Sequence, residues 1–152
     1  MLGKPVPDFT AAVTGAESIS LAALKGKKVV LYFYPKDSTP GCTTEAMQFR
    51  DLHNDYLKAG AVIYGISRDS IKSHTNFQTK LGLPFELISD ADEALCNLFG
   101  VIKMKNMYGK QVRGIERSTF LIDSKGVLTQ EWRGVKADGH AAAVLEAVKA
   151  TQ

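Results

Sequence analysis

An apolar run that stops abruptly at a proline, just before a helix start, limits this chain to a small set of folds. Val29 to Tyr34 is rich in β-branched and aromatic residues, which is typical of a strand buried on both faces. Pro35 closes the run. Thr39 and Pro40 then supply a favoured N-cap residue and the favoured first helical residue. We therefore predict a central strand that leads through a short loop into a helix.

Cys42 falls in the first turn of that predicted helix. The first backbone N–H groups of a helix lack partners within it, so Gly41, Cys42 and Thr43 offer donors to an anionic sulfur at the positive end of the helix dipole. This position favours the thiolate, which is the reactive form of cysteine. The alternative is a small core residue that happens to start a helix, because free cysteines often serve only as core residues.

The remaining pattern predicts an α/β fold with a mixed sheet. Parallel βαβ units followed by an antiparallel hairpin and a helix are the order found in thioredoxin-like folds, with a central sheet flanked by helices. The predicted elements are a helix from Thr43 to Ala59, a strand from Ala61 to Ser67, a helix from Asp69 or Ser70 to Leu81, a strand from Phe85 to Ser89, a helix from Asp92 to Phe99, a hairpin from Ser118 to Arg133, and a helix from Ala141 to Ala150.

Composition narrows the class of protein. A chain of 152 residues that is 45% hydrophobic is ordinary for one globular domain, so we expect a single domain over 1–152. The N-terminus has no apolar signal region, and no apolar run is long enough for a membrane span. Two cysteines suit a reducing compartment, so we expect a cytoplasmic protein, and we expect a monomer. The basic stretch from Lys103 to Arg113 lacks interleaved aromatic residues, which argues against a nucleic-acid partner.

Several chemistries lack their signatures. The three histidines, His53, His74 and His140, are isolated from one another and from the cysteines, so we expect no metal site and place them on the surface or on helix faces. The motifs of nucleotide hydrolysis and of serine hydrolases are absent, and we expect no cofactor. The residue three after Cys42 is Glu45 rather than a second cysteine, which argues against a thioredoxin-type reductase.

Three separate segments together carry a resemblance to a known family. They are Pro35 to Cys42, the following Thr43-Thr44-Glu45-Ala46, and the later run from Gly114 to Asp123. The chain resembles a peroxiredoxin of the bacterioferritin comigratory protein, or Q-type, branch over nearly its whole length. The resemblance implies a thiol peroxidase that reduces hydrogen peroxide and organic hydroperoxides through a sulfenic acid on the peroxidatic cysteine.

The same resemblance assigns expected roles to five residues. Cys42 would be the peroxidatic cysteine, Thr39 would hydrogen-bond the sulfur and the peroxide, and Pro35 would shield the pocket. Arg117 would be the active-site arginine, and Glu45 would help hold it. The chemistry needs such groups, because attack of a thiolate on an O–O bond moves negative charge to the departing oxygen and calls for donors and a fixed cation nearby. An arginine guanidinium supplies a permanent positive charge with several forked N–H donors, a geometry that a lysine would not reproduce.

The chain departs from the family where a second cysteine is usual. Many members carry a resolving cysteine five residues after the first, where this chain has Met47, or in the next helix, where it has Gln78. Cys96 is the remaining thiol, and the helical spacing places it at the border of an apolar face, where it would be accessible. We therefore predict a one-cysteine cycle in which an external thiol, from thioredoxin, glutaredoxin or a small molecule, reduces Cys42. Two other functions stay open: a redox sensor that relays oxidation of Cys42, and a binding domain that uses the basic stretch from Lys103 to Arg113.

Overall fold

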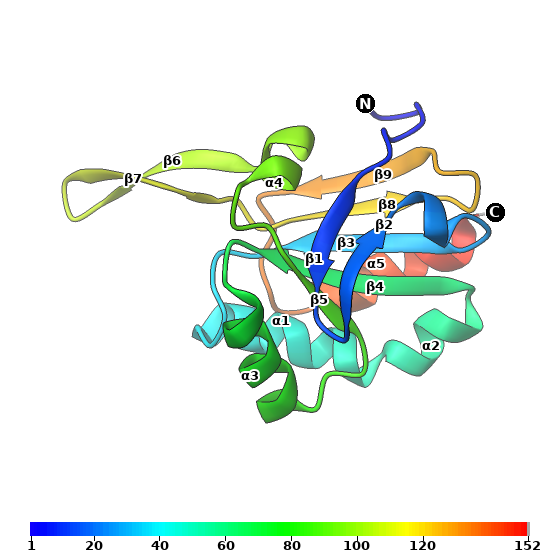
Figure 1. The fold of residues 1–152 in the computed structure, drawn as a ribbon, viewed down its shortest axis with the longest axis horizontal. Helices are drawn as coiled ribbons and strands as arrows, with labels where there is room; N and C mark the ends of the chain where they lie inside the picture. The colour runs from blue at the N-terminus through cyan, green and yellow to red at the C-terminus, as the bar shows by residue number, and fades with distance from the viewer. Residues whose placement is uncertain (152) are drawn as a thin grey trace.

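The computed structural model describes residues 1–151, apart from the side chain of Met107. Its main sheet has seven strands in the order β2-β1-β5-β4-β3-β8-β9, and a separate two-stranded sheet is formed by β6 and β7 (Figure 1). The strands are β1 Thr10–Val13, β2 Ala16–Ser20, β3 Lys28–Phe33, β4 Ala61–Ser67, β5 Glu86–Ser89, β6 Ile102–Met107, β7 Lys110–Ile115, β8 Ser118–Ile122 and β9 Leu128–Arg133. The helices are the 3₁₀-helix η1 Ala22–Leu24, α1 Pro40–Asp51, α2 His53–Lys58, α3 Ile71–Leu81, α4 Ala94–Phe99 and α5 His140–Ala150.

Strand β3 lies at the centre of the mixed sheet, as predicted. It pairs in parallel with β4 and antiparallel with β8, and β4 pairs in parallel with β5. The hairpin of β8 and β9 and the final helix α5 also form where the sequence pattern predicts them. The expected central mixed sheet flanked by helices is therefore confirmed.

Alternate side chains of β3 enter two separate cores, one on each face of the sheet. Tyr32 points into a core shared with Phe49 of α1, Tyr56 of α2 and helices α3 and α5. Phe33 points to the opposite face, which is covered by α4 and the N-terminal segment. Figure 1 shows α1, α2 and α3 on one side of the sheet and α4 on the other. The run from Val29 to Tyr34 is apolar throughout because both of its faces are buried.

The helix predicted from Thr43 to Ala59 is divided in two. Leu52 leaves helical geometry at φ −99° and ψ 4°, which separates α1 from α2. His53 and Asn54, the next two residues, have low helix propensity. After the interruption Tyr56 is buried, and its hydroxyl donates to the carbonyl oxygen of Ala141 in α5 at 2.6 Å. The break thus docks α2 against α5.

Two hairpins are present that the pattern did not predict. Strands β1 and β2 pair with each other, and β1 also pairs with β5. The stretch from Lys103 to Arg113, interpreted from sequence as a basic loop, is a hairpin of β6 and β7 that projects from the body (Figure 1). Its two-residue turn, Tyr108 and Gly109, has φ values of 54° and 80°, as the favoured turns of tight hairpins require.

Candidate active site

The loop after β3 delivers Cys42 to the first turn of α1, where the sequence places it. Thr39 is the N-cap residue and Pro40 the first helical residue. Thr43 N–H donates to the carbonyl oxygen of Thr39 at 2.9 Å, so it is not a free donor, contrary to the expectation from sequence. Within residues 1–151, the N–H groups of Gly41 and Cys42 make no hydrogen bond to protein. These two donors, at the positive end of the helix dipole, lie beside a thiol that is only 2% exposed.

Arg117 and Glu45 meet at this thiol from two different elements. Phe33 of β3 pairs with Ser118 of β8, and this register sets Arg117 beside the loop that follows β3. One terminal nitrogen of Arg117, Nη2, lies 3.5 Å from Cys42 Sγ, and the other, Nη1, donates to Glu45 Oε1 at 2.7 Å. The forked guanidinium is thereby held by the carboxylate while it faces the sulfur.

Glu45 is completely buried, and its second oxygen, Oε2, has no hydrogen-bond partner within residues 1–151. Burial raises the pKa of the Glu45 carboxyl to about 7, although the positive charge of Arg117 opposes this shift. The pKa of Arg117 is raised despite burial, because Glu45 and Cys42 favour its charged form. Arg117 thus stays charged while the protonation of Glu45 changes near neutral pH.

Gly41 makes room for this arginine. A Cβ at position 41 would lie 3.1 Å from Arg117 Nη2 and 3.9 Å from Cζ. The guanidinium therefore packs against the backbone of the first turn of α1, next to Cys42. Any side chain at position 41 would have to displace it.

Thr39 and Pro35 both lie on the loop between β3 and α1, and the hydrogen bond of Thr39 differs from the expected one. The hydroxyl of Thr39 donates to the carbonyl oxygen of Lys36 at 2.8 Å, and neither a side-chain cap nor a bond to Cys42 Sγ occurs. Because its hydrogen is already used, Thr39 Oγ1 presents lone pairs and can accept a hydrogen bond from a bound hydroperoxide. Pro35 is half-buried at the end of β3, on the same loop.

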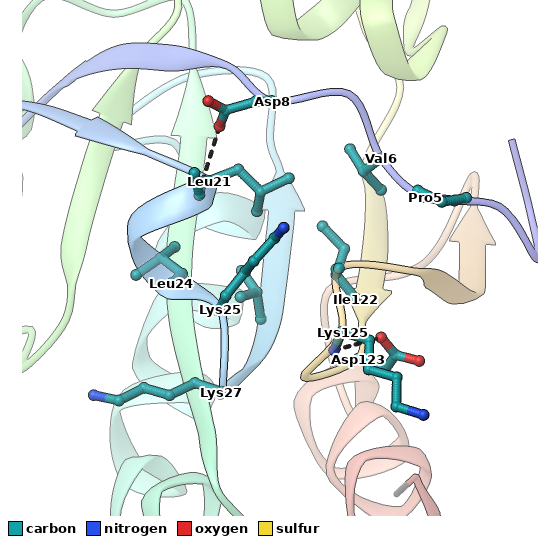
Figure 2. A pocket seen from close by; sticks show the side chains of 13 residues that line it. Pro5, Val6, Asp8, Leu21, Leu24, Lys25, Lys27, Ile122, Asp123 and Lys125 are labelled. Atoms are coloured by element: carbon teal, nitrogen blue, oxygen red, sulfur yellow. Dashed lines mark hydrogen bonds between the residues drawn. The ribbon is translucent and has the colours of Figure 1, made fainter.

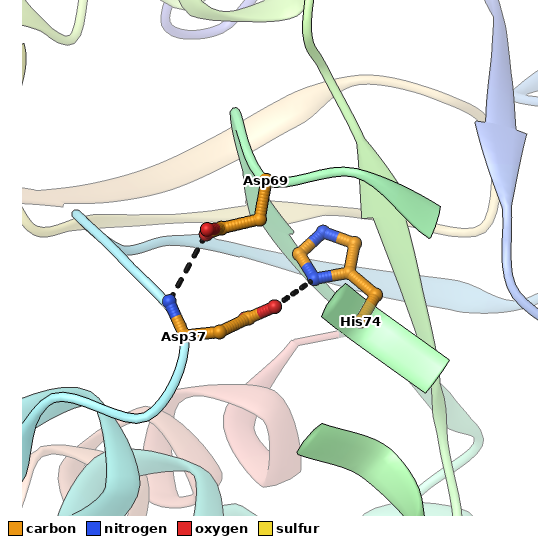
Figure 3. Close-up of side chains that lie close together, drawn as sticks. All are labelled: Asp37, Asp69 and His74. Carbon is orange, nitrogen blue, oxygen red and sulfur yellow. Dashed lines mark hydrogen bonds and ion pairs between the residues drawn. The ribbon is translucent and has the colours of Figure 1, made fainter. Parts of the chain in front are cut away.

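A buried polar network anchors this loop to helix α3 (Figure 3). The carboxylate of Asp37 accepts hydrogen bonds from Tyr34 Oη at 2.6 Å and from Ser73 Oγ at 2.7 Å, and it lies 2.8 Å from His74 Nδ1. The backbone N–H of Asp37 donates to Asp69 Oδ2 at 3.0 Å. His74 is fully buried on α3, so of the two expected positions it has the helix face and not the surface. Sequence reasoning missed this network because the partners come from separate segments.

The ligand atoms of Asp37, Asp69 and His74 lie within 4.8 Å of one another, close enough to hold a metal ion, but they are engaged otherwise. His74 Nε2 is 2.9 Å from the carbonyl oxygen of Ile88, which can only accept, so this nitrogen carries a hydrogen. His74 Nδ1 lies 2.8 Å from Asp37 Oδ2, and this carboxylate also accepts from Tyr34 and Ser73. The atoms that would bind a metal are thus engaged in hydrogen bonds within the protein.

His140 is a second histidine that lies on a helix and is buried rather than on the surface. It begins α5, is 6% exposed, and packs edge-on against Phe49 and Trp132. Burial, together with the positive charge of Arg117, lowers the pKa of His140 to about 4. The neutral ring has its Nε2 at 2.7 Å from Thr119 Oγ1, so it packs beside the site without adding charge to it.

Cys96 is fully buried, which corrects the expectation that it is accessible. It belongs to the core on the α4 face of the sheet, whereas Cys42 belongs to the core on the opposite face. Its backbone N–H donates to Asp90 Oδ2 at 2.8 Å. Burial is the main cause, and Asp90 the second, of a pKa of the Cys96 thiol well above its usual range. Cys96 therefore stays protonated and unreactive.

A cavity of about 160 Å³ lies at the other end of β3 (Figure 2). It is lined by Val29 at the start of β3, by Leu24 of η1 and by Ile122 at the end of β8. In Figure 2 the side chains of Lys27 and Lys125 point away from it. Strand β3 rises about 3.3 Å per residue, so its whole length separates this cavity from Cys42.

The fold and the site define a thiol-based peroxidase of the peroxiredoxin class, and comparisons with known proteins agree. Residues 2–131 match the AhpC/TSA family, and the chain belongs to this family. It is 58% identical to Peroxiredoxin Bcp of Xanthomonas campestris over 143 residues, which cover 94% of this chain and 89% of the relative. It is 48% identical to Peroxiredoxin Bcp of Bacillus subtilis over 148 residues, which cover 97% and 94% of the two chains.

Solved structures show the same relationship. The bacterioferritin comigratory protein of Xanthomonas campestris, studied for alkyl peroxide reduction activity, has 55% identity and a TM-score of 0.92 over 99% of this chain and 97% of that one. BcpB of Mycobacterium tuberculosis has 31% identity and a TM-score of 0.87, again over 99% and 97% of the two chains. The predicted thioredoxin-like fold, the Q-type branch and thiol peroxidase activity are thereby confirmed. No helix among the described residues has the length and apolarity needed to cross a membrane.

Proposed function

We propose that Cys42 is the peroxidatic residue and that this protein reduces hydrogen peroxide and organic hydroperoxides through a sulfenic acid on its sulfur. The observation that carries the proposal is the 3.5 Å approach of Arg117 Nη2 to Cys42 Sγ in a first helical turn with two free N–H groups. All three groups favour a thiolate, and they surround the path along which charge moves in the reaction.

In the oxidative step the thiolate attacks the nearer oxygen of the hydroperoxide. An S–O bond forms, the O–O bond breaks, and the leaving hydroxide or alkoxide takes up a proton to depart as water or alcohol. Arg117 Nη2 stabilises the negative charge as it passes from sulfur to the leaving oxygen. Glu45 acts as a positioning residue, because it holds the guanidinium through Nη1.

Thr39 and Pro35 shape the place where the peroxide binds. The free lone pairs of Thr39 Oγ1 accept the O–H of the incoming hydroperoxide, which turns an oxygen toward the sulfur. The half-buried ring of Pro35 limits access of water to the thiolate. The loop that carries both residues is held by the bonds of Asp37 to Tyr34 and Ser73.

For the reductive step we propose a one-cysteine cycle with an external thiol. Positions 47 and 78 hold a thioether and an amide, which cannot form a disulfide, and Cys96 lies in the core on the other face of the sheet. A thiol of a redox protein such as thioredoxin or glutaredoxin, or of a small molecule, therefore attacks the sulfenic acid. A second thiol then releases Cys42.

Peroxide consumption with dithiothreitol tests the proposal. Sustained consumption by the parent, its loss in Cys42→Ser and its retention in Cys96→Ala are the expected results. Intact mass and peptide mapping after one equivalent of peroxide should place one added oxygen on Cys42. A redox sensor, the other candidate, would stop after about one equivalent; that outcome, or parental turnover by Cys42→Ser, would contradict the proposal.

A further inference from the structure

The hairpin of β6 and β7, called here the basic arm (residues 102–115), takes no part in the proposed chemistry. From Lys103 to Arg113 it has four basic residues and no acidic one, and their charge exceeds the net charge of +3 of the whole chain. Every side chain of described burial from 103 to 113 is exposed, including Met104 at 60% and Tyr108 at 100%. Outside the arm, acidic residues slightly outnumber basic ones, so the net positive charge of the chain comes from this one protruding element.

Three lysines share one face of the basic arm. Lys105 pairs with Val112 and Lys103 with Gly114, so residues 103, 105, 110 and 112 lie on the same face. Arg113 lies on the other face, where it is ion-paired with Glu93 at the start of α4. Among the residues that the structure describes, Lys103, Lys105 and Lys110 have no acidic partner. The lysine face is left to attract negative charge from elsewhere.

The basic arm is joined directly to the candidate site. Strand β7 ends at Ile115, and Arg117, which contacts Cys42 Sγ, follows two residues later. In Figure 1 the arm projects from the end of the sheet at which α1 begins. The ion pairs of Arg113 and Arg68 with Glu93 fix its base to the body. A partner bound at the base of the arm would therefore lie beside Arg117, which contacts Cys42.

We propose that the basic arm is the docking surface for an acidic dithiol protein that reduces Cys42. The proposal rests on the one-cysteine cycle above, which requires an external thiol to reach a buried sulfur. A second copy of this chain would bring a second arm of the same charge, which disfavours self-association. Exposed Met104 and Val112 suit a protein surface, and the arm presents a single exposed aromatic residue, Tyr108, where a nucleic-acid strand would need a series of stacking aromatic residues.

The docked partner reduces the Cys42 sulfenic acid in two steps. Its first thiolate attacks the sulfur of the Cys42 sulfenic acid, an S–S bond forms, and the hydroxide released takes up a proton to leave as water. Its second thiolate then attacks the partner's own sulfur in the mixed disulfide, which frees Cys42 as a thiolate. The partner is oxidised by two electrons to a disulfide, and the sulfenic acid is reduced by the same two.

Charge reversal on the arm tests the docking proposal without altering the site. The double variant Lys103→Glu/Lys110→Glu is compared with Lys27→Glu/Lys125→Glu, which makes the same change in net charge at the far end of β3. Peroxide turnover is measured with a thioredoxin of negative net charge, recycled by its reductase and NADPH, and separately with dithiothreitol. The arm variant should show a KM for thioredoxin that is about tenfold higher and less dependent on salt, with dithiothreitol turnover unchanged. The control variant should behave as the parent.

Other outcomes separate failure of this proposal from failure of the proposed function. Equal KM values for the two double variants, or turnover with dithiothreitol but not with thioredoxin, would overturn the docking proposal alone. The docking proposal would also be overturned if the parent bound duplex DNA, or sedimented as a dimer, and only the arm variant lost this property. The arm would then be assigned to DNA binding or to self-association. If the parent does not consume peroxide with dithiothreitol, the proposed function itself fails.

Discussion

Cys42 and Cys96 lie on opposite faces of the central sheet, in two cores that β3 separates. A disulfide requires Cα atoms within about 7 Å, so a bond between these residues would need one of them to leave its core. We predict that Cys96→Ala keeps steady turnover with dithiothreitol and becomes overoxidised no faster than the parent. Peptide mapping of the oxidised parent provides the check. A mapped Cys42–Cys96 bridge would make Cys96 the resolving cysteine.

Replacing Arg117 with lysine should separate charge from geometry. Lysine keeps the positive charge but cannot face Cys42 Sγ and Glu45 Oε1 with two separate nitrogens. We expect the second-order rate constant for peroxide to fall by about a hundredfold, the usual order for loss of one preorganised donor. Stopped-flow measurement of Cys42 oxidation gives the rate, and the melting temperature shows whether the fold persists. A rate within a factor of two of the parent would exclude Arg117 from the reaction.

The glycine before the thiol offers a more conservative probe of the same arginine. Gly41→Ala should leave α1 formed, because alanine is a better helix former than glycine. It should nevertheless slow Cys42 oxidation about tenfold, since the new Cβ would meet Arg117 Nη2 at 3.1 Å and displace it. Gly114→Ala is the matched control, because a Cβ there meets nothing within 4 Å. Equal rates in the two variants would show that Arg117 tolerates displacement.

Burial of Glu45 should make stability depend on pH. The pKa of this carboxyl is raised from 4.5 to about 7, so between these values the folded state binds more protons than the unfolded state. The stability contributed by protonated Glu45 is fully present below about pH 4.5 and is lost as pH rises through 7. The melting temperature of the parent should fall relative to that of Glu45→Gln between pH 5 and pH 8. Exposed Glu146→Gln should show no such difference.

Asp37 should matter for stability as well as for the site. Asp37→Ala leaves Tyr34, Ser73 and the buried ring of His74 without their shared acceptor. Loss of one partner of a buried pair typically costs about 3–5 kcal/mol, so we expect a decrease of about that size in the free energy of unfolding in urea. Asp51→Ala, at a side chain that is 63% exposed, should change it by less than about 1 kcal/mol. Similar midpoints for the two variants would contradict the anchoring role.

The predictable parts of this molecule are those whose side chains repeat with a regular period. Strand β4 has the predicted bounds, and α3 begins at a Ser70 cap and ends at Gly82 as expected, because burial imposes a pattern on each. The hairpin of β6 and β7 was missed since nearly all of it is exposed, so no apolar alternation marks it. Its local signal was the pair Tyr108-Gly109, with both residues at positive φ.

The candidate site also has a part that the sequence predicts and a part that it does not. Cys42, Glu45 and Arg117 could be named from motifs, and their side chains do meet. Asp37 and His74 could not, because a hydrogen-bonded buried pair needs two polar residues from distant segments and leaves no periodic trace in either one. The hydrogen bond from Thr39 to Lys36 was likewise unpredictable, because the acceptors within reach of the hydroxyl are set by the conformation of the folded loop.

The basic arm also has an evolutionary consequence. Because side chains of described burial between 103 and 113 contribute nothing to either core, substitutions outside the turn and Arg113 should carry only a small folding penalty. Gly41 and Glu45 have no such freedom, since each touches Arg117 or lies buried beside it. Under the docking proposal, lineages could therefore exchange one electron donor for another by altering the hairpin, without changing the residues around Cys42.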